Sequence, residues 1–181
     1  MSVLKTEYLP HYTWSDYQSW EGSWELIDGV PYAMSPAPSI EHQAISSKIH
    51  GQLFDSLKKC EKCQALLPVD WKINEETVVQ PDNLVVCKKV SGQYLNIAPV
   101  IIFEILSPST AKKDTGLKFE LYQQEGVNYY IVVNPNEQVA KVYQLSQEGR
   151  FVKKKDMQNE TFSFALESCD ISFDFSQIWA S

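Results

Sequence analysis

The sequence predicts an α/β fold, at the margin of α+β, in which helices flank a mixed β-sheet. Three observations support this class. Residues 100–106 form an apolar, branched run interrupted only by Glu104, which is typical of a strand covered on both faces. A helix-like segment follows this run, and the apolar segment YYIVVN comes after it. Strand, helix and strand in this order favour a right-handed crossover between parallel strands.

The N-terminal part is predicted to form a short helix and a β-hairpin. Thr13 can cap a helix in the segment WSDYQSW, with Asp16 as its capping-box partner three residues later. The segment SWELIDGVPYAMS has the pattern of two strands joined at an Asp28-Gly29 turn.

A long helix is predicted next, with Ser39 as its N-cap and its end at about Lys59. Its apolar residues recur at every fourth position and form one stripe that can face a sheet. These residues are Ile45, Ile49, Leu53 and Leu57.

Two strands are expected before the run at 100–106. They are the segments ALLPVDWKI and TVVQPDNLVV, joined by a polar turn at residues 74–76. Pro108 then ends the strand at 100–106, because proline cannot donate a backbone hydrogen bond.

The following helix should begin at about Lys112 or Asp114 and end at Glu125, with Gly126 at its C′ position. The strand YYIVVN comes next. A hairpin of QVAKVYQL and RFVKKKD, turning at residues 146–149, and a short helical cap in FSQIWA complete the chain.

We expect a single domain over residues 1–181. It divides into an N-terminal helix and hairpin (13–35), a core (39–135), and a C-terminal hairpin and tail (136–181). A chain of 181 residues can bury a sizeable core without disulfides, and its 44% hydrophobic and 22% charged residues are typical of globular proteins.

Composition also limits the class of function and the location. The net charge of −7 argues against a protein that binds nucleic acid non-specifically through phosphate neutralisation. It does not exclude a nuclease, because acids that hold Mg²⁺ create a local cationic site. The absence of a long apolar run and of a signal-peptide core predicts no membrane contact and a cytoplasmic location.

Four cysteines are present, at positions 60, 63, 87 and 169. Cys60 and Cys63 have the C-x₂-C spacing of a metal-binding knuckle, but a second such pair does not follow. We therefore expect free thiols, with zinc or iron–sulfur binding by this pair as the open alternative.

Glu104 is the residue that most needs an explanation. A buried, ionised carboxylate is unfavourable unless it is paired, hydrogen-bonded or bound to a cation. Strand alternation places Ile102, Glu104 and Leu106 on one face. Asp82 precedes the apolar segment NLVVC, so neighbouring strands could bring Asp82 and Glu104 together. Two carboxylates suit Mg²⁺ or Mn²⁺, which prefer oxygen ligands.

These residues carry a family resemblance. Pro81-Asp82 followed by Glu104 resembles the PD-(D/E)XK motif of the restriction-endonuclease-like superfamily. The chain more closely resembles a bacterial family of restriction-endonuclease-like proteins, formerly a domain of unknown function. The resemblance covers about residues 24–135, in four segments. They are WELIDGVPYAMSPAPSIEHQ, PVDWKINEETVVQPDNLVV, FEILSPSTAKKDTGLKFELY and EGVNYYIVVNP.

The resemblance implies a core of helix, three-stranded meander, helix and final strand, and metal-dependent cleavage of nucleic acid, with DNA as the expected substrate. It implies that Asp82, Glu104 and the backbone carbonyl of Ile105 bind the metal. The superfamily motif would place lysine at position 106, where this chain has Leu106. In the closer family the lysine role moves to the following helix, where Lys118 matches. A homodimer is also expected from the resemblance alone.

Four further residues are candidates for the site, each with an alternative. His42 faces the sheet at the start of its helix, and a histidine bonded within the fold is equally consistent with the pattern. Asp70 is either a third acid at the metal or an aspartate bonded in a turn. Glu25 could point into the site, but an exposed hairpin acid is the expectation. We expect Tyr122 to be a packing residue with a hydrated hydroxyl.

Two alternatives concern function. Glu104 could instead form a structural ion pair with Lys118, and the chain could be a catalytically silent module that binds nucleic acid or protein. The basic segment RFVKKKD is predicted to be the solvated face of an edge strand rather than a DNA contact. The chain has no G-x-S-x-G, P-loop or H-E-x-x-H motif, so other hydrolase classes have no support.

Overall fold

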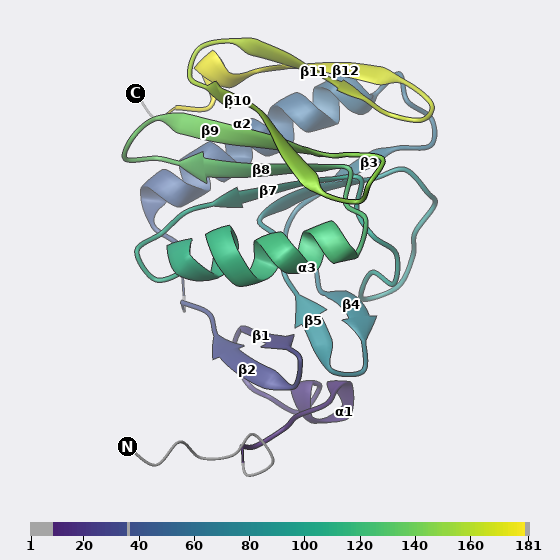
Figure 1. Ribbon diagram of the computed structural model, residues 1–181, viewed down its shortest axis with the longest axis vertical. Helices are drawn as coiled ribbons and strands as arrows, with labels where there is room; N and C mark the ends of the chain where they lie inside the picture. Colours follow the sequence, from purple (N-terminus) through teal and green to yellow (C-terminus); the bar gives the residue numbers. More distant parts are fainter. Residues whose placement is uncertain (1–8, 36, 180–181) are drawn as a thin grey trace.

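The computed structural model describes residues 9–35 and 37–179, and its largest sheet has six strands in the order β10-β9-β8-β7-β6-β3 (Figure 1). β7 and β8 are parallel neighbours, and the other neighbouring pairs are antiparallel. The strands are β3 (Gln64–Leu66), β6 (Asn83–Val86), β7 (Ile101–Ile105), β8 (Tyr129–Asn134), β9 (Val139–Leu145) and β10 (Phe151–Met157). The predicted mixed sheet and the parallel crossover are therefore confirmed.

A four-stranded sheet in the order β2-β1-β5-β4 lies at the N-terminal end of the molecule (Figure 1). Its strands are β1 (Trp24–Ile27), β2 (Val30–Ala33), β4 (Trp71–Asn74) and β5 (Thr77–Val79). The predicted hairpin turn is confirmed: Asp28 and Gly29 have φ values of 49° and 75°, as a two-residue primed turn requires. The helix α1 (Trp14–Tyr17) adjoins this sheet, and Asp16 accepts hydrogen bonds from Thr13, as predicted.

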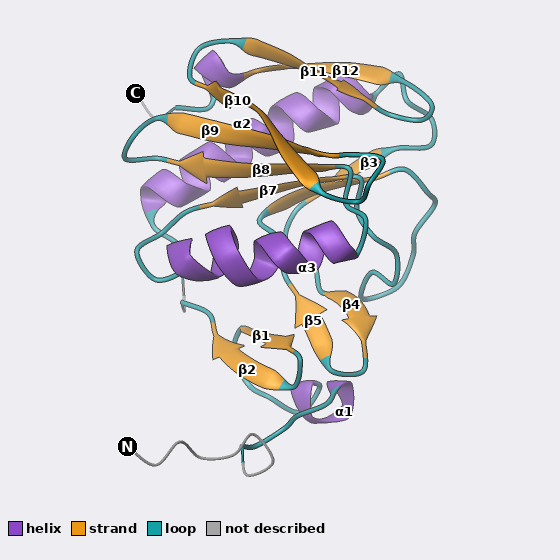
Figure 2. Cartoon of the chain, viewed as in Figure 1, coloured by secondary structure: helices purple, strands orange, loops and turns teal. Residues whose placement is uncertain are grey.

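The helix α2 (Ile40–Leu57) covers one face of the six-stranded sheet (Figure 2). It begins as predicted, because the Ser39 side chain accepts a hydrogen bond from the backbone N–H of His42. Its predicted apolar stripe is buried and packs against alternate residues of β7. Those residues are Ile101, Phe103 and Ile105.

The helix α3 (Lys118–Gln124) lies on the opposite face (Figure 2), where Tyr122 packs among Ile102 and Trp71. A π-helical turn, η2 (Lys113–Leu117), leads directly into it. Gly126 follows the helix with a φ of 78°, which confirms the predicted C-terminal signal. The strict alternation of β7 therefore directs Glu104 toward the α3 face.

The two strands expected before residue 100 are each divided in two, which corrects the prediction. ALLPVDWKI covers most of β3 and β4, and TVVQPDNLVV contains β5 and β6. β3 and β6 pair in the six-stranded sheet, whereas β4 and β5 pair in the four-stranded sheet. Pro68 and Pro81 lie at the two divisions. Because proline interrupts strand pairing, each marks the point where the chain passes between sheets.

The C-terminal hairpin of β9 and β10 is confirmed, but a further hairpin was not predicted. It consists of β11 (Thr161–Ala165) and β12 (Asp170–Asp174), followed by a short 3₁₀ helix (Phe175–Gln177) where a helical cap was expected. Phe164 and Phe173 from this hairpin pack on Phe103. The hairpin thus covers the α2 side of the sheet.

The expectation of free thiols is wrong. Cys60 is joined to Cys169, and Cys63 to Cys87. The C-x₂-C pair consequently has no thiolate available for a metal. The first disulfide connects the end of α2 to the β11–β12 hairpin, and the second connects the residues next to β3 and β6. No helix in the described ranges is long and apolar enough to cross a membrane.

Ile49→Ala should lower the free energy of unfolding by about 2–5 kcal/mol, because Ile49 is fully buried and its removal leaves a cavity. Ile40→Ala is the matched control: it lies on the same helix but is 90% exposed, so its effect should stay within about 0.5 kcal/mol. Urea denaturation measures both values. Equal effects of the two substitutions would contradict the assigned face of α2.

Replacing Cys60 and Cys169 together with serine should lower the free energy of unfolding by up to about 4 kcal/mol, because this disulfide closes a long loop of 109 residues. Thiol titration of the denatured, unreduced protein should detect none of the four cysteines. Four reactive thiols would contradict the pairing. If the cysteines of the protein isolated from its cells are paired, this result would argue against the predicted cytoplasmic location, because disulfides are rare in reducing compartments.

Candidate active site

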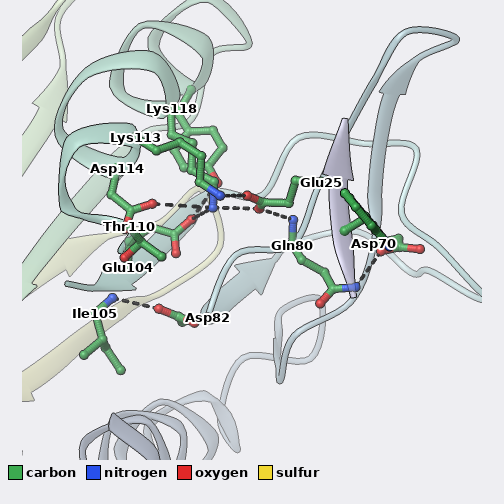
Figure 3. A network of polar contacts seen from close by, with 12 residues as sticks. Glu25, Asp70, Gln80, Asp82, Glu104, Ile105, Thr110, Lys113, Asp114 and Lys118 are labelled. Atoms are coloured by element: carbon green, nitrogen blue, oxygen red, sulfur yellow. Dashed lines mark hydrogen bonds and ion pairs between the residues drawn. The ribbon is translucent and has the colours of Figure 1, made fainter. Parts of the chain in front are cut away.

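A cluster of buried charged residues lies between the six-stranded sheet, α3 and the four-stranded sheet (Figure 3). Glu25 is 0% exposed, and Glu104, Asp114 and Lys118 are each 2% exposed. Burying charged groups is unfavourable unless each has a partner. The contacts within this cluster therefore determine what it can do.

The register of two neighbouring strands brings Asp82 opposite Glu104. Asn83 on β6 pairs with Phe103 on β7, so the residue before Asn83 faces the residue after Phe103. Asp82 Oδ2 accepts a hydrogen bond of 2.8 Å from the backbone N–H of Ile105. The expected neighbourhood of β6 and β7 is thus present, and it fixes the position of the Asp82 carboxylate.

His42 contacts the same carboxylate from the start of α2. Its Nε2 lies 3.2 Å from Asp82 Oδ2, and its Nδ1 is buried without a hydrogen-bond partner among the described residues. The hydrogen bond to Asp82 is the main reason why the pKa of His42 is raised, against the lowering effect of burial. His42 is therefore bonded within the fold and, at the same time, orients Asp82.

Lys118 points inward to three carboxylates. Its Nζ lies 2.8 Å from Glu104 Oε1, 2.7 Å from Glu25 Oε1 and 3.6 Å from Asp114 Oδ1. Burial alone would lower the pKa of Lys118, but these carboxylates outweigh it and raise the pKa well above its ordinary value. Lys118 therefore stays positively charged. The ion pair with Glu104 considered from the sequence is present.

The π-helical turn brings a second lysine to this cluster. The backbone N–H of Lys118 bonds to the carbonyl of Lys113, five residues earlier, and this widened turn directs both side chains to one partner. Lys113 Nζ lies 2.5 Å from Glu25 Oε2. Sequence reasoning missed both Lys113 and Asp114 as site residues, although the i,i+4 spacing of Asp114 and Lys118 was a usable signal.

Glu25 is a buried member of the cluster, so the expectation of an exposed hairpin acid is wrong. Burial tends to raise its pKa, but Lys118 and Lys113 outweigh this effect and lower it. Its Oε1 also accepts a hydrogen bond of 2.9 Å from the backbone N–H of Gln80. Through these contacts β1 of the four-stranded sheet is tied to η2 and α3.

Asp70 lies at the far end of the network from Asp82 (Figure 3). Its Oδ1 accepts hydrogen bonds from Tyr17 Oη (2.9 Å) and from Gln80 Nε2 (2.8 Å). The structure therefore does not bring Asp70 to the pair of Asp82 and Glu104. It lies instead next to β4 of the four-stranded sheet and bonds to α1 through Tyr17.

Tyr122 has a buried hydroxyl, which corrects the expectation of a hydrated one. The hydroxyl donates a hydrogen bond of 2.7 Å to Glu104 Oε1. Leu106, at the position of the superfamily lysine, is partly buried against the apolar cluster on the same side of the sheet. Lys118 from α3 reaches Glu104 in its place.

Carboxyl groups outnumber lysines in the cluster. Four carboxylates (Glu25, Asp82, Glu104 and Asp114) face two lysines (Lys113 and Lys118). Burial raises the pKa of Glu104 well above its ordinary value, Lys118 opposes this, and the neighbouring carboxylates add to it. A divalent cation beside these carboxyl groups would oppose this rise and favour their ionised form.

The donor atoms suit Mg²⁺ or Mn²⁺, although the described residues contain no group of three or more acidic, histidine or cysteine side chains placed to hold a metal. Mg²⁺ is commonly bound through one or two carboxylates, with water completing its coordination. Both hydrogen bonds found for Glu104 use Oε1, and both found for Asp82 use Oδ2. One oxygen of each carboxylate is thus left for a cation.

Comparison with known proteins finds a family model, a protein of similar sequence and a solved structure of similar fold. A family model, Uma2, described as "Putative restriction endonuclease", matches residues 14–170. "Uncharacterized protein slr1290" of Synechocystis sp. (strain ATCC 27184 / PCC 6803 / Kazusa) is 28% identical over 151 residues, which are 78% of this chain and 78% of that protein. A crystal structure of a "putative nuclease belonging to DUF820" from Anabaena variabilis ATCC 29413 superposes with a TM-score of 0.75 at 18% identity, covering 92% of this chain and 97% of that one.

The structural match confirms the restriction-endonuclease-like fold predicted from the sequence. The family model spans the N-terminal hairpin, the strands that carry Asp82 and Glu104, and the helix that carries Lys118. The chain therefore belongs to the Uma2 family, described as "Putative restriction endonuclease".

Proposed function

We propose that this protein is a metal-dependent nuclease that hydrolyses phosphodiester bonds of nucleic acid, with DNA as its substrate. Membership of the family and the nuclease-like fold support a nuclease in general. The observation that carries the specific proposal is the cluster that joins the partly buried Asp82 to the buried Glu104 and Lys118, in which carboxyl groups outnumber lysines.

In the proposed site, Mg²⁺ or Mn²⁺ is held by Asp82, Glu104 and the backbone carbonyl of Ile105. In a strand the N–H and C=O of one residue point to the same side, and the N–H of Ile105 points to Asp82, so its carbonyl faces that side too. When bound, the cation would polarise a phosphoryl oxygen and lower the pKa of a bound water.

The protein's own groups set up this chemistry. The backbone N–H of Ile105 and the imidazole of His42 hold the Asp82 carboxylate in place. Tyr122 and Lys118 hold Glu104 through its Oε1. Fixing both carboxylates before substrate arrives reduces the reorganisation that the reaction requires.

Lys118 is the proposed catalytic lysine. Its ammonium group lies beside Glu104, where it can position the attacking water or offset charge on the phosphate. Its donors face Glu104, Glu25 and Asp114, so direct contact with a phosphate oxygen requires exchange of one of these partners. Lys113 pairs with Glu25, which in turn contacts Lys118.

The alternative is a catalytically silent module that retains the fold and binds nucleic acid or protein. Two observations favour it: Lys118 already pairs with Glu104, and the described residues offer no metal-binding group of three side chains. Binding of Mn²⁺ discriminates between the two functions, because a silent module needs no cation in the cluster.

A homodimer and a cytoplasmic location stay predictions.

Glu104→Gln should lower the rate of Mg²⁺-dependent cleavage of DNA by about 10²-fold or more, because it removes a charged metal ligand while keeping the shape of the side chain. Asp82→Asn should have the same effect. Mn²⁺ binding followed by calorimetry should also be lost in both variants, which separates a metal-site defect from a purely kinetic one. Asp55→Asn, at an exposed acid on α2, is the control and should behave as wild type. Unchanged cleavage by Glu104→Gln would refute the assignment.

Lys118→Met should lower the rate constant for cleavage by about 10²- to 10³-fold, the usual effect of removing one electrostatic stabiliser at a reaction centre. Lys113→Met should have a smaller effect, because Lys113 contacts Glu25 and its contact with Glu104 is indirect. Single-turnover cleavage with saturating Mg²⁺ measures both rates. Equal rates for the two variants would argue that the lysines act only by balancing buried charge.

A further inference from the structure

A cavity of about 310 Å³ lies at the N-terminal end of the molecule, lined by residues from α1, the four-stranded sheet and the loop before β7. This volume is at the lower end of the range of about 300–1,000 Å³ that is typical of small-ligand sites. None of the catalytic residues proposed above lines the cavity. It is therefore a separate feature that the proposed chemistry does not explain.

Five aromatic side chains line the cavity and form a connected arc. They are Trp14, Tyr17, Trp20, Trp24 and Tyr94. Trp14 lies 4.9 Å from Tyr94 and 5.5 Å from Tyr17 between ring centroids, and the contacts continue from Tyr17 to Trp20 and from Trp20 to Trp24.

These aromatic rings are not core residues. Tyr94 is 39% exposed, and the other four are half-buried, whereas the core aromatic residues of this protein are almost fully buried. Tryptophan and tyrosine at a partly exposed cavity offer flat apolar faces without filling it. Such faces stack well against another planar ring.

Polar groups occupy one side of the same cavity. Asp70 and Gln80 line it, and they are hydrogen-bonded to each other through Asp70 Oδ1. Tyr17 donates to that same oxygen, so the bonds found for Asp70 leave its Oδ2 as an acceptor. A planar ligand that carries an amino group can therefore stack on the aromatic arc and donate a hydrogen bond to Asp70.

Gln80 connects the cavity to the charged cluster (Figure 3). Its side chain donates to Asp70, and its backbone N–H donates to Glu25, which is bonded to Lys118. Gln80, the residue that follows β5, thus contacts a member of each site. A ligand that spans both would need a planar group at one end and a phosphodiester at the other.

We propose that this aromatic cavity binds an unpaired nucleobase with an exocyclic amino group, such as cytosine, from the same nucleic-acid strand that is cleaved at the proposed metal site. The inference rests on the proposed nuclease function and extends it, because it assigns the substrate class as nucleic acid with an unstacked base. Carboxylate acceptors are suited to the amino group of cytosine. Stacking on aromatic rings binds unpaired bases in many proteins that recognise single strands.

Net charge is consistent with this mode of binding. At a net charge of −7, the protein cannot rely on phosphate neutralisation over a wide surface. Stacking contributes affinity that does not depend on positive charge. Binding through the cavity should therefore weaken less with added salt than binding by a basic protein does.

The test measures binding without cleavage. The full-length protein is titrated in EDTA with a single-stranded oligodeoxycytidine of about ten nucleotides, and tryptophan fluorescence reports binding at the cavity. An oligonucleotide of the same length and charge, with abasic sites in place of the bases, is the ligand control. We expect quenching by oligodeoxycytidine and at least about tenfold weaker binding of the abasic strand.

Tyr94→Leu should weaken binding of oligodeoxycytidine about tenfold and leave binding of the abasic strand unchanged, because it removes one stacking face. Phe54→Leu replaces an exposed aromatic residue on α2, away from the cavity, and should bind as wild type. Asp70→Asn should reduce the preference for oligodeoxycytidine over oligothymidine. Circular dichroism with thermal unfolding verifies that each variant is folded.

Three results would overturn the inference: equal affinity for the abasic strand, wild-type affinity in Tyr94→Leu, or no binding of any strand. The first two results are independent of the nuclease proposal, because they compare binding of strands in the absence of a metal. If wild type binds oligodeoxycytidine as expected but cleaves no nucleic acid with Mg²⁺ or Mn²⁺, the nuclease proposal fails and the base site stands. If cleavage occurs and Tyr94→Leu does not raise KM, the base site fails alone.

Discussion

The pairing of Glu104 with Lys118 is the interaction on which the rest of this structure depends. Glu104 lies near the end of β7, a strand that is covered on both faces, where an uncompensated carboxylate would be strongly destabilising. The compensating ammonium comes from the helix across the sheet, and it brings Glu25 and Asp114 with it. These contacts connect three parts of the fold. They join β7 to α3, to the π-helical turn before α3 and to the N-terminal hairpin.

Much of the framework could be predicted because it follows from local patterns. The stripe on α2, the alternation of β7, the Asp28-Gly29 turn and the strand at YYIVVN each depend on a few neighbouring residues. Long-range features could not be derived in this way. The division of two expected strands between sheets depends on which partner each half finds, and a proline alone shows only that pairing stops. The β11–β12 hairpin did carry an alternating pattern of apolar residues, but its strands are short, and the core residue that it covers, Phe103, lies far away in sequence.

The site shows the same division between local and distant information. Asp82 and Glu104 could be identified because each stands out against an apolar strand. Lys113 was not identified, and Glu25 was expected to be exposed, because the burial of both results from a contact between η2 and β1 across 88 residues of sequence. The sequence around Glu25 does not indicate that this hairpin residue will form ion pairs with Lys113 and Lys118. The cysteine pairing likewise depends on the folded chain. The C-x₂-C spacing suggested a shared metal site for Cys60 and Cys63, whereas each of them forms a disulfide with a distant cysteine.

The two outer strands of the six-stranded sheet limit how copies of this chain can associate. β3 is only three residues long, and the Cys63–Cys87 link fastens its start to β6. β10 is longer, but its exposed middle is a run of lysines with an irregular register against β9. Short strands, lysines and bulges all hinder the lateral addition of another chain's backbone. A dimer in which the six-stranded sheet continues into a second copy is therefore disfavoured at both edges of that sheet.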